Sequence, residues 1–178
     1  MWRSFLTQWN CRSFFVDEEI IAPDFDLFTD ATSSVGYGSY FQEGWIAHQR
    51  PNILFEEREP PIAFLELYLI AMAAALWGYL WSNKRIRFLC DNTTTVAICN
   101  KGRSKCPLVM QLTRKLVLTT ARRNFVFYAT HLPGKRHSIG DALSRLQLSK
   151  FRRLAPTAQK EQTPVLSMVD ITYPPLQT

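Results

Sequence analysis

The segment from Ile62 to Trp81 constrains the fold more than any other part of the sequence, because nearly all of its residues are apolar. Glu66 is its one charged residue, and two prolines stand directly before it. A helix that is apolar on every side needs other elements to cover most of its surface. The segment is short for a membrane span and contains a charge, so we expect a buried helix over 63–81 and no membrane association.

The remaining sequence predicts short strands and helices that could cover this helix. Strands are expected at 26–31, 36–41, 45–49, 85–90 and 125–130. Gly44 is expected to take a positive φ in the tight turn between the second and third strands. Further helices are expected at 92–100, 107–122 and 138–148. This order predicts an α/β fold with a mixed five-stranded sheet, three antiparallel strands followed by two parallel ones, and helices on both faces.

The domain itself is expected to span residues 23–153. Residues 1–22 are aromatic and irregular, and we interpret them as the tail of a preceding connection region. After Leu154 the chain contains mainly Ala, Pro, Thr, Gln and Lys, so residues 154–178 are predicted to be a linker with little order.

Charge is distributed unevenly along the chain, whose net charge is +6. Up to Glu66 there are eleven acidic and four basic residues, whereas 84–160 holds seventeen basic residues and two acids. A strongly positive surface most often binds a polyphosphate, although a solvated basic face or pairing with the acidic first third are alternatives. We therefore expect nucleic acid as the partner, and the candidate contacts are Lys101, Arg103, Lys105 and Asn92.

The cysteines do not predict a metal site. The four cysteines, Cys11, Cys90, Cys99 and Cys106, contain no C-x-x-C pair. No finger or ribbon spacing joins them to the histidines, so zinc is not indicated. Free, buried cysteines in a reducing compartment are the better interpretation.

Four carboxylates are the candidate catalytic residues, and each also has an ordinary structural explanation. Asp30 lies in an apolar strand but could face water at its end. Glu66 could stabilise the first turn of its helix by interacting with the helix dipole, and Asp91 could belong to a strand-to-helix turn. Asp141 fits a capping box that starts at Ser138. Taken singly, these signals are weak.

Together the four acids are far more informative, because Asp91 and Asp141 are the only acids in the basic region. Cleavage of a phosphodiester by two divalent cations needs such a cluster, with the ions about 4 Å apart. Carboxylate oxygens suit Mg²⁺ or Mn²⁺ better than zinc.

Four stretches then resemble successive motifs of retroelement ribonucleases H. They are LFTDATSSVGYGSYF, FLELYLIAMAAALWG, RFLCDNTTTVA and HLPGKRHSIGDALSRLQ. The resemblance covers about residues 3–157 and is nearest to DIRS-type retrotransposons, in which this domain follows the reverse transcriptase. It implies an endonuclease that hydrolyses the RNA strand of RNA–DNA hybrids, with the polymerase region of the same polyprotein as a partner.

The resemblance also implies roles for the four carboxylates, Asp30, Glu66, Asp91 and Asp141, in catalysis and metal binding. Asp30 would bridge two Mg²⁺ or Mn²⁺ ions, Asp141 would complete the ion on the nucleophile side, and Glu66 and Asp91 would serve the leaving-group side.

This sequence departs from the family pattern at three places. Leu65 replaces a residue that is often polar, and His137 stands where relatives usually have asparagine. The mobile histidine loop of cellular ribonucleases H is missing or shortened. We expect His137 to be a solvated loop residue rather than a catalytic one, and His131 to be structural.

Two other classes of protein remain as alternatives. An integrase or transposase uses similar chemistry on DNA ends, but its glutamate typically comes third, whereas Glu66 comes second here. A catalytically inactive nucleic-acid-binding remnant or domesticated domain would usually lose carboxylates, and this chain retains all four.

Overall fold

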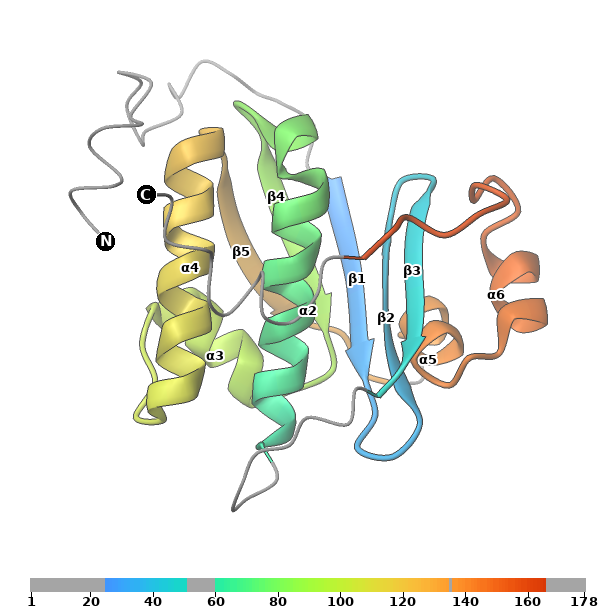
Figure 1. Cartoon of the computed structure of the whole chain (residues 1–178), viewed down its shortest axis with the longest axis horizontal. Coiled ribbons are helices and arrows are strands. Elements are labelled where there is room, and N and C mark those ends of the chain that lie inside the picture. The colour runs from blue at the N-terminus through green and yellow to red at the C-terminus, as the bar shows by residue number, and fades with distance from the viewer. Residues whose placement is uncertain (1–24, 51–59, 135, 166–178) are drawn as a thin grey trace.

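The computed structural model describes residues 25–50, 60–134 and 136–165. These residues form one mixed sheet with helices on both faces (Figure 1). Its strands are β1 (Phe25–Ala31), β2 (Gly36–Phe41), β3 (Gly44–Gln49), β4 (Arg85–Cys90) and β5 (Val126–His131). Its helices are α2 (Ile62–Trp77), α3 (Thr93–Lys101), α4 (Pro107–Arg123), α5 (Ser138–Ser144) and α6 (Leu148–Leu154), with a 3-10 turn, η1, at Gly78–Trp81.

The strand order is β3-β2-β1-β4-β5. The β1–β2 and β2–β3 pairs are antiparallel, whereas β1–β4 and β4–β5 are parallel. Each parallel pair is connected through helices, because a crossover must carry the chain back to the start of the next strand. The mixed five-stranded sheet with helices on both faces that the sequence predicts is therefore confirmed.

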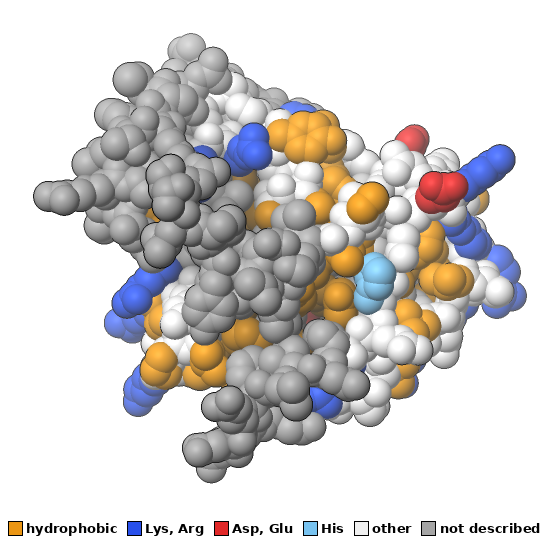
Figure 2. Space-filling view, in the orientation of Figure 1, with side chains coloured by type: hydrophobic (Ala, Val, Ile, Leu, Met, Phe, Trp, Pro, Cys, Tyr) orange, Lys and Arg blue, Asp and Glu red, His pale blue; other side chains and the backbone are white. Residues whose placement is uncertain are grey.

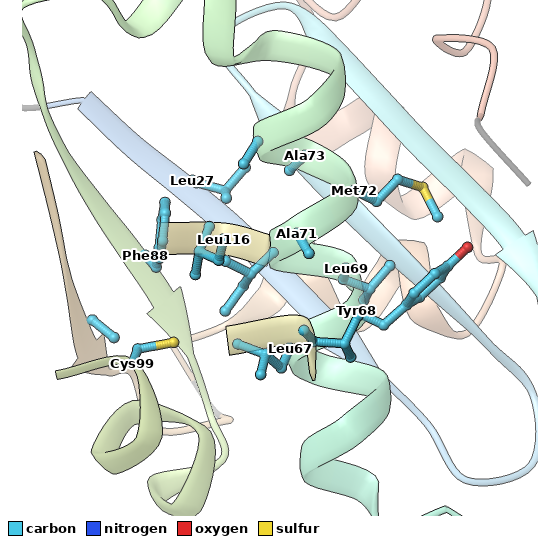
Figure 3. Close-up of a cluster of buried hydrophobic side chains, with 14 of the residues drawn as sticks. Leu27, Leu67, Tyr68, Leu69, Ala71, Met72, Ala73, Phe88, Cys99 and Leu116 are labelled. Atoms are coloured by element: carbon cyan, nitrogen blue, oxygen red, sulfur yellow. The ribbon is translucent and has the colours of Figure 1, made fainter. Parts of the chain in front are cut away.

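Helix α2 forms the centre of the larger core. It packs on the sheet beside α4, and side chains from β1, β4 and both helices meet around it (Figure 3). The apolar stretch Ile62–Trp81 is long and apolar enough to cross a membrane, but 78% of its most apolar part is buried inside the fold. Glu66 is buried in this helix with 1% of its surface exposed, so it needs partners within the protein.

A second, smaller core lies on the opposite face of the sheet, under α5 and α6. Tyr40 and Trp45 from the sheet pack against Phe151 of α6, with ring centroids 5.6 and 5.3 Å apart. Gly38 allows α5 to approach β2, because a Cβ there would lie 2.4 Å from the Leu143 Cβ. This close approach brings the helix that contains Asp141 onto the strands beside β1.

The turn between β2 and β3 differs from the prediction. Gln42, not Gly44, takes the positive φ, at 54°. Gly44 is needed for a different reason, since a Cβ at this position would lie 3.0 Å from the indole nitrogen of Trp77. The glycine therefore makes room for α2.

The last helix is shorter than predicted and ends at Ser144. Leu146 has a φ of 57°, its N–H donates to the Leu143 carbonyl, and the Gln147 N–H donates to the Ala142 carbonyl. These bonds form a Schellman motif, in which the left-handed residue is usually glycine. Because leucine occupies that position here, the sequence did not indicate that the helix ends before it. The chain then continues into α6 as a separate helix.

Residues 155–165 also differ from the expected linker, since they lie along β3. The Trp45 indole N–H donates to the Gln159 carbonyl at 2.7 Å, and the Thr163 N–H donates to the Trp45 carbonyl at 2.8 Å. The side chain of Arg152 stacks on Trp45 and donates to carbonyls of this segment. These contacts cover the free edge of β3. The expected tail over 1–22 and the end of the expected linker, 166–178, lie outside the described residues.

Candidate active site

Three of the four candidate carboxylates line one cleft. Asp30 lies near the end of β1, Asp91 directly follows β4, and Asp141 lies in the first turn of α5. β1 and β4 are adjacent and parallel, so their carboxyl ends lie at the same edge of the sheet, where ligands commonly bind. The cleft measures about 320 Å³ and is lined by Asp30, Ala31, Thr32, Asp91, Gly134, His137, Asp141 and Arg145.

Glu66 lies behind this cleft rather than on its surface. The Ala31 N–H donates to its Oε1 at 3.0 Å, and the Cys90 thiol donates to its Oε2 at 3.4 Å. A carboxylate oxygen of Glu66, the Cys90 sulfur and a carboxylate oxygen of Asp91 lie within 4.8 Å of one another. Glu66 is thus fixed between β1 and β4 and adjoins Asp91.

The carboxylates are close enough to affect one another's ionisation. Burial, followed by the charge of Asp30, raises the pKa of Glu66 to about 8. Burial also raises the pKa of Asp30, and the charges of Asp91 and Asp141 act in the same direction, whereas a hydrogen bond from Ser144 opposes it. Carboxylates that repel each other in this way form a site suited to cations.

Asp141 forms ion pairs with two basic side chains. Its Oδ1 accepts from Arg145 Nε at 2.5 Å, and its Oδ2 accepts from Lys150 Nζ at 3.0 Å. Partial burial raises the pKa of Asp141, but the hydrogen bonds and charges of Arg145 and Lys150 outweigh that effect and lower it. The capping box expected at Ser138 does not form, because His137 is the residue that precedes the helix and no side chain caps it.

The donor set fits a divalent cation. Asp30, Asp91 and Asp141 line the cleft, and a carboxylate oxygen of Glu66 lies within 4.8 Å of one of Asp91. The sulfur of Cys90 is not a thiolate ligand here, because burial raises the pKa of its thiol and the proton is donated to Glu66. Hard, oxygen-binding ions such as Mg²⁺ or Mn²⁺ match this chemistry.

His137 is not the solvated loop residue that the sequence suggested. It is 1% exposed, and its Nε2 lies 2.8 Å from the carbonyl oxygen of Thr29. The imidazole is buried because α5 packs over the end of β1. His131 is exposed, and its Nε2 lies 3.1 Å from the backbone oxygen of Asp91, where β4 ends.

The candidate nucleic-acid contacts lie at the two ends of α3. Asn92 precedes the helix and caps it, because its side chain accepts from the Thr95 N–H at 3.0 Å. Lys101, Arg103 and Lys105 are exposed at and beyond the other end. A nine-residue helix separates these basic residues from Asp91. Its length is about 13 Å at 1.5 Å per residue.

Several residues of the site were not predicted from the sequence. Ser144, Arg145 and Lys150 contact the carboxylates, and Ser144 donates to Oδ2 of Asp30. Ser144 and Arg145 lie one helical turn after Asp141, a spacing that could have indicated them. Lys150 belongs to α6 and is brought back by the break at Leu146, which the sequence pattern did not predict.

The strand order together with the two helical layers defines a ribonuclease H-like fold. No family model and no curated protein matches the chain. Among solved structures, the N-terminal ribonuclease H domain of a Mycobacterium tuberculosis protein, solved as a fusion with maltose-binding protein, is 15% identical. That alignment covers 74% of this chain and 98% of the other, with a TM-score of 0.45. Ribonuclease H1 from the halophilic archaeon Halobacterium salinarum is 17% identical over 70% of this chain and 96% of its own, with a TM-score of 0.41.

Proposed function

We propose that this chain is a metal-dependent endonuclease that hydrolyses the RNA strand of RNA–DNA hybrids, and that it acts within the polyprotein of a DIRS-type retrotransposon. The observation that carries the proposal is the placement of Asp30, Asp91 and Asp141 around one cleft with Glu66 directly behind it. The retroelement origin is supported by the order of the four sequence motifs.

The four carboxylates are the residues proposed to hold two Mg²⁺ or Mn²⁺ ions. Such a pair of ions would supply an activated water and stabilisation of the leaving 3′ oxygen. Asp30 is proposed to contribute to both ion sites, since it lies in the central strand between Asp91 and the helix of Asp141. Glu66, held by the Ala31 N–H and the Cys90 thiol, keeps a fixed orientation beside Asp91.

The basic side chains around the cleft are proposed to bind phosphates of the substrate. Arg145 lines the cleft. Lys101, Arg103 and Lys105 are exposed at and beyond the end of α3 that is farther from Asp91. Asn92 caps α3 next to Asp91 and is a further candidate. Preference for RNA in the cut strand would come from contacts to 2′-hydroxyl groups in the shallow minor groove of the hybrid.

A cleavage assay tests this function directly. The chain is incubated with Mg²⁺ and a labelled RNA–DNA hybrid, and in parallel with single-stranded RNA and with double-stranded DNA. The proposal predicts cuts in the RNA of the hybrid alone, and no cuts when EDTA replaces Mg²⁺. Tight hybrid binding without cleavage would favour a catalytically inactive binding domain, and cleavage of DNA ends would favour an integrase-like or transposase-like activity.

A further inference from the structure

The face of α5 that meets β1 contains three residues at helical spacing. His137, Gly140 and Ser144 stand at i, i+3 and i+7, so they lie on the same side of the helix. All three are buried. His137 also lines the cleft, as Asp141 does from the neighbouring side of the helix. This buried face, His137–Gly140–Ser144, is the contact between the helix of Asp141 and the strand of Asp30.

Two of these residues hold β1 at adjacent positions. The His137 Nε2 lies 2.8 Å from the carbonyl oxygen of Thr29, so this nitrogen carries the proton and donates it. The Ser144 hydroxyl donates to Oδ2 of Asp30 itself. One contact therefore fixes the backbone directly before Asp30, and the other fixes the orientation of its carboxylate.

Gly140 lets the helix come this close. A Cβ at position 140 would lie 2.1 Å from His137 Nε2 and 3.0 Å from the Cβ of Asp30. Contacts below 3.0 Å require a shift of the neighbouring atoms. The space that a larger residue would fill is occupied by the imidazole, which lies between the helix and the strand.

We infer that His137 and Ser144 are positioning residues, which set the orientation of Asp30 and its place relative to Asp141 so that the two carboxylates share divalent cations. This inference rests on the proposed function. Groups that orient a metal ligand typically contribute ten- to a hundred-fold to metal affinity or activity. Because Ser144 occupies one side of the Asp30 carboxylate, it limits the orientations from which that group can bind an ion.

Ser144→Ala tests the role of the hydroxyl, and Ser39→Ala is the matched control. Ser39 is a fully buried serine of β2, the strand that pairs with the strand of Asp30, and its hydroxyl has no partner among the described residues. The affinity for Mn²⁺ is measured by isothermal titration calorimetry on the whole chain without nucleic acid. We expect Ser144→Ala to bind Mn²⁺ roughly ten-fold more weakly, and Ser39→Ala to bind it as the wild type does.

His137→Gln and His137→Leu test the second contact. Glutamine can present an N–H to the Thr29 carbonyl, whereas leucine cannot, so the first should retain most of the Mn²⁺ affinity that the second loses. Thermal unfolding of each variant identifies those that are folded at the titration temperature. Equal Mn²⁺ affinity of the wild type, Ser144→Ala and His137→Leu would overturn the inference.

The cleavage assay separates this inference from the proposed function. At saturating hybrid, Ser144→Ala should need more Mg²⁺ to reach half its maximal rate, with hybrid affinity unchanged. If the wild type binds Mn²⁺ but cleaves nothing, the proposed function fails, while the titrations still decide whether Ser144 and His137 position the carboxylates. If the wild type binds no divalent ion, both fail.

Discussion

Glu66 is a carboxylic acid in an environment very different from water. It lies in an apolar helix with 1% of its surface exposed, and within the described part of the chain its hydrogen-bond donors are the Ala31 N–H and the Cys90 thiol. Burial and the charge of Asp30 raise its pKa to about 8. At neutral pH and without a cation, the folded chain therefore tends to keep Glu66 protonated.

The raised pKa predicts how stability depends on pH. Between the unfolded value of 4.5 and the folded value of about 8, the folded chain binds more protons than the unfolded chain. The stability that Glu66 contributes is fully present below pH 4.5 and is lost as pH rises through about 8. We therefore expect Glu66→Gln to be more stable than the wild type at pH 8.5 without metal, by at least about 1 kcal/mol.

Thermal unfolding in EDTA at several pH values measures this effect. The difference between Glu66→Gln and the wild type should shrink toward pH 5, and Mg²⁺ should stabilise the wild type more than the variant at high pH. A difference that does not change with pH would show that Glu66 ionises normally in the fold.

At the scale of the elements, the sequence predicted most of the fold. Short stretches rich in aromatic and aliphatic residues predicted all five strands, and the apolar segment predicted α2. The break at Leu146 was missed, since glycine rather than leucine is the usual sign of a left-handed residue. The contacts of 155–165 were missed because they are made largely by backbone groups and the side chain of Arg152.

For the site, three of the four carboxylates chosen from the sequence line one cleft, but what surrounds them was not predicted. Asp30, Asp91 and Asp141 were chosen because they lie within a strand, at a strand end and at a helix start, and because they match the motifs of retroelement ribonucleases H. The burial of His137 and the hydrogen bond from Ser144 to Asp30 depend on how closely α5 approaches β1. Small residues permit a close approach, but their presence in the sequence does not predict one.

The approach of α5 to the sheet should be sensitive to one residue of β2. Gly38→Ala would place a Cβ 2.4 Å from that of Leu143, so α5 must move. We expect a loss of stability of roughly 1–3 kcal/mol together with weaker Mn²⁺ binding. Ser39→Ala, at the next residue of the same strand, serves as the control and should change neither quantity by much. Urea unfolding that leaves Gly38→Ala as stable as the control would contradict this close packing.

At the scale of the whole molecule, charge is segregated. Residues 84–160 hold seventeen basic residues and two acids, and Lys and Arg side chains project at both ends of the face shown in Figure 2. The two acids are the site residues Asp91 and Asp141, so two of the four site carboxylates come from a largely positive half of the chain. Such an arrangement suits a polyanion whose phosphates are held near bound cations.

Hybrid binding should therefore depend steeply on salt. Each phosphate neutralised by a protein cation steepens the fall of log affinity with log salt. Replacing Lys101, Arg103 and Lys105 with glutamine should weaken binding and make that dependence shallower. The same substitution at Lys160 and Arg153, which are also exposed, provides the comparison. Fluorescence anisotropy between 50 and about 200 mM salt measures both slopes, and an affinity that does not change with salt would contradict phosphate recognition.

The four carboxylates are proposed to hold the metal ions that drive cleavage, and the substitution Asp30→Asn tests this proposal. The substitution is nearly isosteric and removes one negative charge from the middle of the cluster. Loss of an ion removes several kcal/mol of transition-state stabilisation, so cleavage of a saturating RNA–DNA hybrid in Mg²⁺ should fall roughly a thousand-fold or more. Hybrid binding should persist or tighten, because the lost charge repelled phosphate. If Asp30→Asn cleaves the hybrid as fast as the wild type under these conditions, the carboxylate cluster is not the catalytic site.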